Sequence, residues 1–268
     1  MKIGNKNFVQ SEKTYVMGIL NVTPDSFSDG GSYTSIDKAM EQTQKMIQQG
    51  ADIIDVGGES TRPGHVQIGD EEEIRRVVPI IRKIKKKFDI PVSIDTYKSA
   101  VAKAALEAGA DLLNDIWGFR YDEKMAELAA EYDVPVCLMH NRDNLDYDDF
   151  MEDVKKDLQI SLDIAEKYGV KKENIMLDPG VGFGKTYEQN LIVMNHLEEI
   201  VDMGYPVLLG TSRKSVIGLT LDLPVDEREE GTLATSVLGA IKGCQFVRVH
   251  DVEKNVRALK MTDAILHS

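Results

Sequence analysis

Eight short apolar segments recur along the chain, and each is followed by a polar or glycine-rich stretch and then by a helical pattern. The apolar segments are YVMGIL (15–20), DIIDV (52–56), PVSID (91–95), DLLND (111–115), VPVCLM (134–139), NIMLD (174–178), PVLLG (206–210) and FVRVH (246–250). Helical patterns occupy 36–49, 71–87, 98–108, 122–132, 151–168, 187–203, 228–242 and 252–267. A spacing of about 20 to 40 residues between apolar segments suits one strand and one helix per unit.

This repetition predicts an α/β fold. Near-continuous apolar strands covered by helices are typical of a parallel sheet. Eight strand–helix units favour a closed (β/α)8 TIM barrel, with a doubly wound open sheet as the alternative. No linker rich in Pro, Ser or Gly divides the chain, so we expect one domain over 1–268. A turn at 4–7 predicts a short N-terminal hairpin over the barrel floor, with a frayed tail as the alternative.

Charge and cysteine content exclude several classes of partner. The net charge of −13 argues against nucleic acid, which selects basic surfaces, and against anionic membranes. Cys137 and Cys244 lie in apolar segments without metal-ligand spacing, which indicates buried thiols in a reducing compartment. The first ten residues, MKIGNKNFVQ, hold no apolar signal core, and no stretch reaches transmembrane length. We therefore expect a soluble cytoplasmic protein.

The stretch LDPGVGFGKT (177–186) looks like a phosphate-binding P-loop but is not one. The pattern G-x-x-x-x-G-K-[ST] needs a glycine five residues before Gly184, and Pro179 stands there. Thr186 and Gln189 have the spacing of a capping box. The glycines therefore predict a tight turn after a strand, with Lys185 and Thr186 simply starting the next helix.

A (β/α)8 barrel carries its active site at the C-terminal ends of its strands, and all the predicted strand ends are polar. Arg248 and His250 lie two apart on one strand, so both should project to the same side as an anion site. The alternative is an Arg248 that bridges a neighbouring acid beside a solvated His250. Asn21 ends the adjoining strand, and a neutral oxygen beside an anion suits Mg²⁺.

Asp95, Asn114 and Asp178 lie near the ends of three further strands. Carboxylate and amide groups there suit a flat heterocycle with an amino-pyrimidinone edge, because unpaired buried carboxylates are costly. The alternative is that some of them cap helices or pair with lysines. Lys214 follows Ser212, an expected N-cap, and so should lie in the first turn of a helix, against its dipole. That placement suggests a functional lysine, although a surface lysine remains open.

The chain resembles the dihydropteroate synthase family of folate biosynthesis over nearly its whole length. The segments that carry the resemblance are GILNVTPDSFSDGG (18–31), GGESTRPG (57–64), SIDTYK (93–98), NDIWG (114–118), LMHNRD (138–143), LDPGVGFGKT (177–186), LLGTSRKS (208–215), GTLATSVLGAIKGC (231–244) and FVRVHDV (246–252). The first two are highly specific signatures.

The resemblance implies a (β/α)8 barrel that condenses 6-hydroxymethyl-7,8-dihydropterin diphosphate with p-aminobenzoate, giving 7,8-dihydropteroate and pyrophosphate. It implies that this enzyme class, a sulfonamide target, forms a homodimer through outer helices near the C-terminal units. Carried over by position, the pterin would be held by Asp95, Asn114, Asp178 and Lys214. The diphosphate would be held by Asn21, Arg248, His250, Asp29 and Arg62, with Asn21 on Mg²⁺ and with Asp29 and Arg62 closing over the site. The p-aminobenzoate site would be shaped by Thr61, Pro63, Phe183 and Ser215.

These residues fit a dissociative, SN1-like path. Arg248, His250 and Mg²⁺ would stabilise the leaving pyrophosphate, while Asp95 and Asp178 would surround a developing cation with negative charge. Three other functions remain open at this point. They are an aldolase with Lys214 as a Schiff base, a methyltetrahydrofolate-binding barrel of a corrinoid methyltransferase, and a pterin-binding module without catalysis.

Overall fold

The structure of the protein is a computed structural model, and it describes residues 1–9, 12–22, 32–59 and 67–268. Eight parallel strands form one sheet in the order β8-β7-β6-β5-β4-β3-β10-β9. They are β3 (Tyr15–Asn21), β4 (Ile53–Gly57), β5 (Val92–Asp95), β6 (Leu112–Asp115), β7 (Val136–Met139), β8 (Ile175–Asp178), β9 (Leu208–Leu209) and β10 (Phe246–Val249). A parallel bridge between Leu177 and Val207 joins β8 to β9. The sheet therefore closes, which confirms the barrel and excludes the open sheet.

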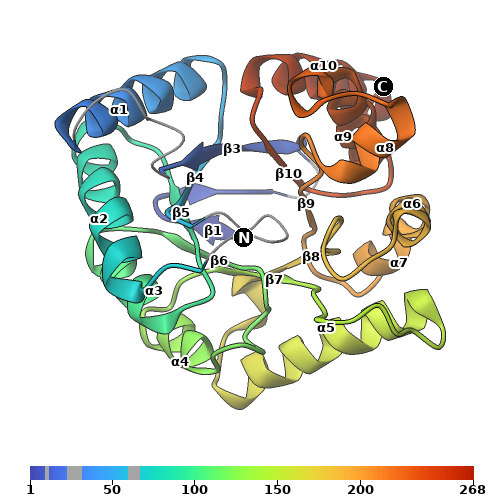
Figure 1. Ribbon diagram of the computed structural model, residues 1–268, viewed down its shortest axis with the longest axis horizontal. Coiled ribbons are helices and arrows are strands. Elements are labelled where there is room, and N and C mark those ends of the chain that lie inside the picture. Colours follow the sequence, from blue (N-terminus) through green and yellow to red (C-terminus); the bar gives the residue numbers. More distant parts are fainter. Residues whose placement is uncertain (10–11, 23–31, 60–66) are drawn as a thin grey trace.

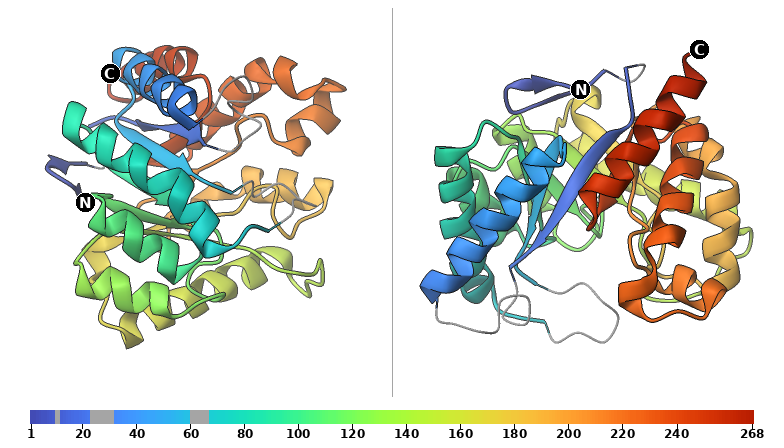
Figure 2. Two further views of the ribbon diagram at one scale, coloured as in Figure 1. Left: turned by 60° about the vertical axis from the view of Figure 1, so that its left-hand side comes forward. Right: turned by 90° about the horizontal axis from the view of Figure 1, so that it is seen from above.

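Helices surround the barrel and connect successive strands (Figure 1; Figure 2). They are α1 (Ser32–Gln48), α2 (Asp70–Lys87), α3 (Ser99–Glu107), α4 (Lys124–Glu131), α5 (Phe150–Lys167), α6 (Tyr187–Asn195), α7 (Leu197–Val201), α8 (Ser215–Leu221), α9 (Glu229–Ile241) and α10 (Val252–Leu266). Within the described residues, 3-10 turns cover Lys172–Asn174 and Val225–Glu227. Among the described ranges, no helix is long and apolar enough to cross a membrane.

The predicted elements match the observed ones closely, with one break. The pattern at 187–203 predicts one helix, but the backbone leaves helical geometry at His196, whose φ and ψ are −118° and 29°. That residue ends α6 and begins α7. The predicted capping box at the start of α6 is confirmed: the side chain of Thr186 accepts from the Gln189 amide, and the Gln189 side chain accepts from the Thr186 amide.

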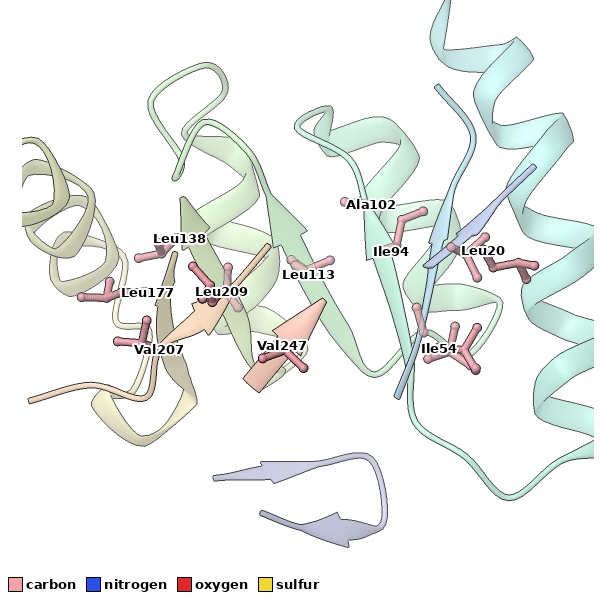
Figure 3. Close-up of a cluster of buried hydrophobic side chains, with 14 of the residues drawn as sticks. Leu20, Ile54, Ile94, Ala102, Leu113, Leu138, Leu177, Val207, Leu209 and Val247 are labelled. Atoms are coloured by element: carbon pink, nitrogen blue, oxygen red, sulfur yellow. The ribbon is translucent and has the colours of Figure 1, made fainter. Parts of the chain in front are cut away.

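The outward faces of the strands pack against the helices. Figure 3 shows this layer, in which Leu20, Ile54, Ile94, Leu113, Leu138, Leu177, Leu209 and Val247 are buried. Since alternate strand residues point to opposite faces, the residues between them point into the barrel. The helices therefore cover an almost continuous aliphatic surface, and burial of such surface is the main favourable term in folding.

The N-terminal residues form the predicted hairpin, with β1 (Lys2–Ile3) antiparallel to β2 (Lys6–Asn7). It lies across one end of the barrel (Figure 1; Figure 2). The ring of Phe8 lies 4.8 Å from that of Tyr15 and 5.6 Å from that of Phe246. Ile3 and Phe8 join a buried cluster with apolar residues that begin the strands, namely Tyr15, Met17, Ile53, Leu112, Cys137, Met176, Leu208 and Phe246. The hairpin thus covers the floor of the barrel, as predicted.

Candidate active site

A buried ion-pair group lies at the polar end of the barrel. In β10, Arg248 follows the floor residue Phe246 by two positions and projects inward with it. Its Nε donates to Oδ2 of Asp55 at 2.6 Å, and its Nη2 donates to Oδ2 of Asp95 at 2.6 Å. The side chain of Asn114 completes the group by donating to Oδ2 of Asp55 at 3.3 Å. Residues from four strands therefore meet here.

Asp55 is a site residue that the sequence analysis does not identify. It lies inside β4 with no exposed surface, between Ile54 and Val56. The strand-end criterion passes over it, because Asp55 precedes the end of its strand. A charged residue within an otherwise apolar strand is nevertheless a signal in its own right, since a buried carboxylate needs a partner. Here the partner is Arg248.

Two carboxylates share one guanidinium in this group. Burial raises the pKa of Asp95 to about 7, with Arg248 acting in the opposite direction and Asp55 adding to the rise. The pKa of Arg248 is raised because the neighbouring carboxylates outweigh its own burial. Arg248 therefore stays charged, and Asp95 becomes mostly protonated only as the pH falls below about 7. Among the described residues, Oδ1 of Asp55 and Oδ1 of Asp95 are buried without a hydrogen-bond partner.

A second charged pair lies beside the first. A Cβ built on Gly210 would lie 3.7 Å from Oδ2 of Asp178, 3.9 Å from Nζ of Lys214 and 3.9 Å from Cβ of Arg248, so these three converge around one glycine. Burial raises the pKa of Asp178, and Lys214 opposes that rise. Burial lowers the pKa of Lys214 to about 8, and Asp178 opposes that fall. The pair therefore holds two groups whose charged forms are both costly to bury.

The predicted position of Lys214 inside a helix is wrong. Helix α8 begins at Ser215, and Lys214 is its N-cap with an extended backbone (φ −68°, ψ 161°). Ser212 does not cap this helix; its hydroxyl instead lies 2.9 Å from Nδ1 of His250. Because Lys214 precedes the helix, its side chain points back, and Nζ donates to the carbonyl of Val181 and lies 4.7 Å from the centre of the Phe183 ring.

The segment between β8 and α6, residues 179–186, turns tightly as predicted. Gly180 has a φ of +68°, and a Cβ there would lie 1.8 Å from the carbonyl oxygen of His140, so only glycine fits. Oδ1 of Asp178 accepts from the Gly180 amide at 2.7 Å. The expectation that Lys185 simply starts the next helix is wrong, because its Nζ donates back to the carbonyls of Gly180 at 2.9 Å and Phe183 at 3.1 Å.

The remaining predicted residues lie at the same end of the barrel or outside the described residues. Asn21 ends β3, and a Cβ built on Gly57 would lie 3.5 Å from its Oδ1 and 3.6 Å from Oδ2 of Asp95. Ser215 is exposed in the first turn of α8. The predicted residues that lie outside the described ranges are Asp29, Thr61, Arg62 and Pro63.

Known proteins with similar sequences and structures identify the family of this chain. The profile of the pterin binding enzyme family matches residues 17–250. The dihydropteroate synthase of Clostridium beijerinckii is 65% identical over 267 residues, which cover 99% of each chain. The chain belongs to the dihydropteroate synthase family. It is therefore a transferase, and its family is one of pterin binding enzymes.

Solved structures of this family superpose closely on the barrel. The dihydropteroate synthase of Clostridium difficile, determined in the presence of pteroic acid, has a TM-score of 0.95 and 54% identity, covering 98% of this chain and 100% of that one. The enzyme of Xanthomonas albilineans with 4-aminobenzoic acid has a TM-score of 0.92 and 40% identity, covering 96% and 95%. The TIM-barrel fold and the N-terminal hairpin are thus those of the dihydropteroate synthases.

Proposed function

We propose that the protein joins 6-hydroxymethyl-7,8-dihydropterin diphosphate to p-aminobenzoate with release of pyrophosphate, and that the described strand-end residues perform this reaction. The observation that carries the assignment is the meeting of Asp55, Asp95 and Arg248, with two buried carboxylate oxygens that no described residue satisfies. Such oxygens are costly unless a donor reaches them. The N–H edge of a pterin supplies such donors.

The pterin part of the substrate is assigned to Asp95, Asn114, Asp178 and Lys214. Asp95 and Asp178 present carboxylates from β5 and β8, which are three strands apart in the barrel, while Lys214 offers an ammonium group beside Asp178. Carboxylates accept from ring and exocyclic N–H groups, and an ammonium donates to a ring carbonyl. This set therefore matches a heterocycle that carries both donors and an acceptor. The pteroic acid named for the Clostridium difficile structure contains the same ring system.

Lys214 serves here as a held cation rather than as a Schiff-base nucleophile. Its Nζ donates to the Val181 carbonyl, faces the Phe183 ring and lies near Asp178. These contacts orient a charged amine. The aldolase interpretation therefore has less support than recognition of the pterin.

The diphosphate is assigned to Asn21, Arg248 and His250, together with Asp29 and Arg62. Nε and Nη2 of Arg248 bind Asp55 and Asp95. Such a bridge to a neighbouring acid is the alternative to an anion site that the sequence leaves open. Nη1 is the guanidinium nitrogen left to reach a substrate oxygen. His250 stands two residues further along and is oriented by Ser212.

Magnesium fits the same corner. The side-chain oxygen of Asn21 is a neutral ligand at the end of β3, close to the position of Asp95. Within the described residues, no group of three His, Cys, Asp or Glu side chains could hold a metal, so the ion would depend on Asn21, substrate oxygens and water. Bound there, it would neutralise part of the charge on the diphosphate.

The aryl amine is assigned to Phe183 and Ser215, with Thr61 and Pro63. Phe183 is half-buried in the 179–186 segment, and Ser215 begins α8. The C–O bond at the pterin methylene breaks, its electron pair leaves with pyrophosphate, the amine nitrogen forms the new C–N bond, and one amine proton goes to solvent. Asp55, Asp95 and Asp178 place carboxylates around the cation that develops at the pterin methylene, which favours a dissociative path.

We also propose one domain over 1–268, a homodimer and a cytoplasmic location. The C-terminal helix supports the single domain, because Asp263 of α10 accepts from the amide and the hydroxyl of Thr14 at 3.0 and 2.9 Å. Exposed apolar residues on α8 to α10 support the dimer; Leu219, Ile241, Met261 and Ile265 are each more than half exposed. Buried, unpaired Cys137 and Cys244 suit a reducing compartment.

Pyrophosphate release with both substrates and Mg²⁺ tests the reaction. We expect release that requires the pterin diphosphate, p-aminobenzoate and the metal together. A dissociative path also predicts positional isotope exchange in the diphosphate without p-aminobenzoate. A protein that binds the pterin but releases no pyrophosphate would be a binding module, which contradicts the proposal.

A further inference from the structure

Lys185 is a half-buried lysine that the reaction as assigned above does not use. It lies in the 179–186 segment just before α6, and its Nζ points back to carbonyl groups of the same segment. Three acceptors surround the nitrogen: the carbonyls of Gly180 at 2.9 Å and Phe183 at 3.1 Å, and Nδ1 of His140 at 2.6 Å. An ammonium has three donors and no acceptor, so all three of its hydrogens are used.

The third contact extends to a second element. When Lys185 is charged it can only donate, so Nδ1 of His140 accepts and its Nε2 carries the hydrogen. Nε2 lies 3.1 Å from Oδ2 of Asp157 on α5, and Asp157 also accepts from Nε of Arg142. Burial lowers the pKa of His140 to about 4, so the imidazole is neutral, as this tautomer requires. A neutral ring thus joins the Lys185 cation to a carboxylate.

The carbonyls that Lys185 holds flank the part of the segment that faces the site. Between Gly180 and Phe183 lies Val181, whose carbonyl accepts from Nζ of Lys214. The Phe183 ring lies 4.7 Å from the same nitrogen. The Gly180 amide donates to Asp178. These contacts with Asp178 and Lys214 all come from residues 180–183. Lys185 binds the carbonyl groups at both ends of that stretch, Gly180 and Phe183.

The charge on Lys185 is part of the same arrangement. Asp178 and Asp157 stabilise its charged form, Lys214 and Arg120 destabilise it, and burial lowers its pKa to about 7. A side chain at 185 that is shorter or lacks an N–H donor would leave the buried carbonyl of Gly180 and Nδ1 of His140 without the donor seen here, and that loss is unfavourable. The segment would then have to move to satisfy them, which would displace Phe183.

We propose that Lys185 is a positioning residue for the condensation, which fixes the Phe183 ring and the Val181 carbonyl relative to Lys214, and that His140 and Asp157 hold Lys185 in place. The inference rests on the proposed function, because it takes Phe183 as part of the aryl-amine site and Lys214 as part of the pterin site. It predicts that substitution of Lys185 impairs the binding and orientation of the substrates more than it lowers the stability of the fold.

The test compares Lys185→Met with Lys242→Met in the full-length protein. Lys242 is a matched control, because its Nζ also donates to a backbone carbonyl, that of Asn195, and also contacts a carboxylate, Glu198. In Lys185→Met we expect the KM for p-aminobenzoate to rise about 10- to 100-fold, since small displacements in a site cost factors of this size. Binding of pteroic acid should weaken less, and Lys242→Met should leave both unchanged.

Two further measurements separate positioning from a structural role. Trp117 is the chain's only tryptophan, and it packs on the same cluster of Tyr97, Ile116 and Met139 as Phe183 does. Its emission should therefore change in Lys185→Met and remain unchanged in Lys242→Met. In a double-mutant cycle, Lys185→Met should add little to the KM defect of Phe183→Leu, because both act through the same ring.

Lys185→Gln keeps the test decisive if Lys185→Met does not fold. The amide retains donors without the charge, so its KM defect should be smaller than that of Phe183→Leu and its emission shift partial. Unchanged KM and unchanged emission in the Lys185 variants, or additive effects in the cycle, would overturn the inference. Absence of condensation activity in the wild-type protein would instead overturn the proposed function.

Discussion

The two ends of the barrel interior are built from the same strands but hold opposite chemistry. In β10, the floor residue Phe246 is followed two positions later by Arg248, and in β8, Met176 is followed by Asp178. Both members of each pair point inward. The floor members join the cluster covered by the N-terminal hairpin, whereas the upper members enter the charged group. A step of two residues therefore separates the part that stabilises the barrel from the part that we propose binds the substrates.

This separation explains how the protein tolerates costly groups. Burial raises the pKa of Asp95 and Asp178 and lowers that of Lys214, so each charged form is unfavourable where it lies. Perturbed groups of this kind cluster at functional sites. Apolar burial at the floor and beneath the helices offsets their cost. We therefore expect substitutions at the floor to change stability alone and those at the upper end to change binding, with one exception.

The exception is Arg248→Met, for which we expect the largest effect. The variant leaves Asp55 and Asp95 buried without their cation, and breaking a buried pair in this way costs about 3–5 kcal/mol. Condensation activity should be lost as well. Chemical denaturation and pyrophosphate release measure the two effects. The double variant Asp55→Asn/Arg248→Met should regain part of the stability and none of the activity. If Arg248→Met alone is as stable as the wild-type protein, the ion pairs do not stabilise the fold.

Phe246→Ala should have an effect of similar size on stability but none on catalysis. Phe246 has no exposed surface and lies within 5.6 Å of the rings of Phe8 and Tyr15, so its removal leaves a cavity. Such truncations cost about 3–5 kcal/mol. Steady-state kinetics well below the unfolding transition should give an unaltered kcat/KM. A reduced kcat/KM under these conditions would mean that the two ends are coupled.

Several features of both ends of the barrel can be predicted from the sequence. Strand and helix positions follow from the apolar repeats, and Asp95, Asn114 and Asp178 follow from the rule that barrel sites lie at strand ends. The hairpin follows from the turn at 4–7. These features depend on local pattern, which is readable along the chain.

Other features depend on contacts between distant segments. Asp55 joins the site through Arg248, which lies on the other side of β3, and no local pattern pairs these residues. Lys185 meets His140 across the loops that follow two strands. The start of α8 at Ser215 depends on Lys214 pointing back to Val181 and on Ser212 binding His250. Tertiary contacts here override the capping preference of Ser212.

Asp178→Asn should give an intermediate effect and sharpen the contrast between the ends. The amide loses a charged acceptor for the pterin, which we expect to weaken binding of pteroic acid by about 1.5–3 kcal/mol. Stability should change less than in Arg248→Met, because burial already disfavours the Asp178 charge, although the variant also removes a carboxylate that stabilises charged Lys214. Asp263→Asn is the matched control, since that carboxylate binds Thr14 away from the site. It should lower stability and leave affinity unchanged, as measured by calorimetry and thermal unfolding.

The smallest expected effect is the pH dependence of pterin affinity. In the proposed site, ionised Asp95 accepts from the pterin and charged Lys214 donates to it. The pKa of Asp95 is raised to about 7, so affinity should fall as pH drops below about 7. The loss should be at most about tenfold per pH unit, the limit for one proton. The pKa of Lys214 is lowered to about 8, so affinity should also fall above about pH 8. Calorimetric titration with pteroic acid should therefore show an optimum between these values.

Two variants assign the limbs of this profile, and stability gives an independent check of the acid limb. Asp95→Asn should flatten only the acid limb and Lys214→Met only the alkaline limb, while titration of the ligand itself would persist in both. In the free protein, folded Asp95 binds its proton more tightly than the unfolded residue with a pKa of 3.8. Its contribution to the free energy of unfolding therefore declines as pH rises from about 4 to about 7. That decline should disappear in Asp95→Asn but persist in Phe246→Ala, whose site is intact; an identical decline in Asp95→Asn would assign the proton to another residue.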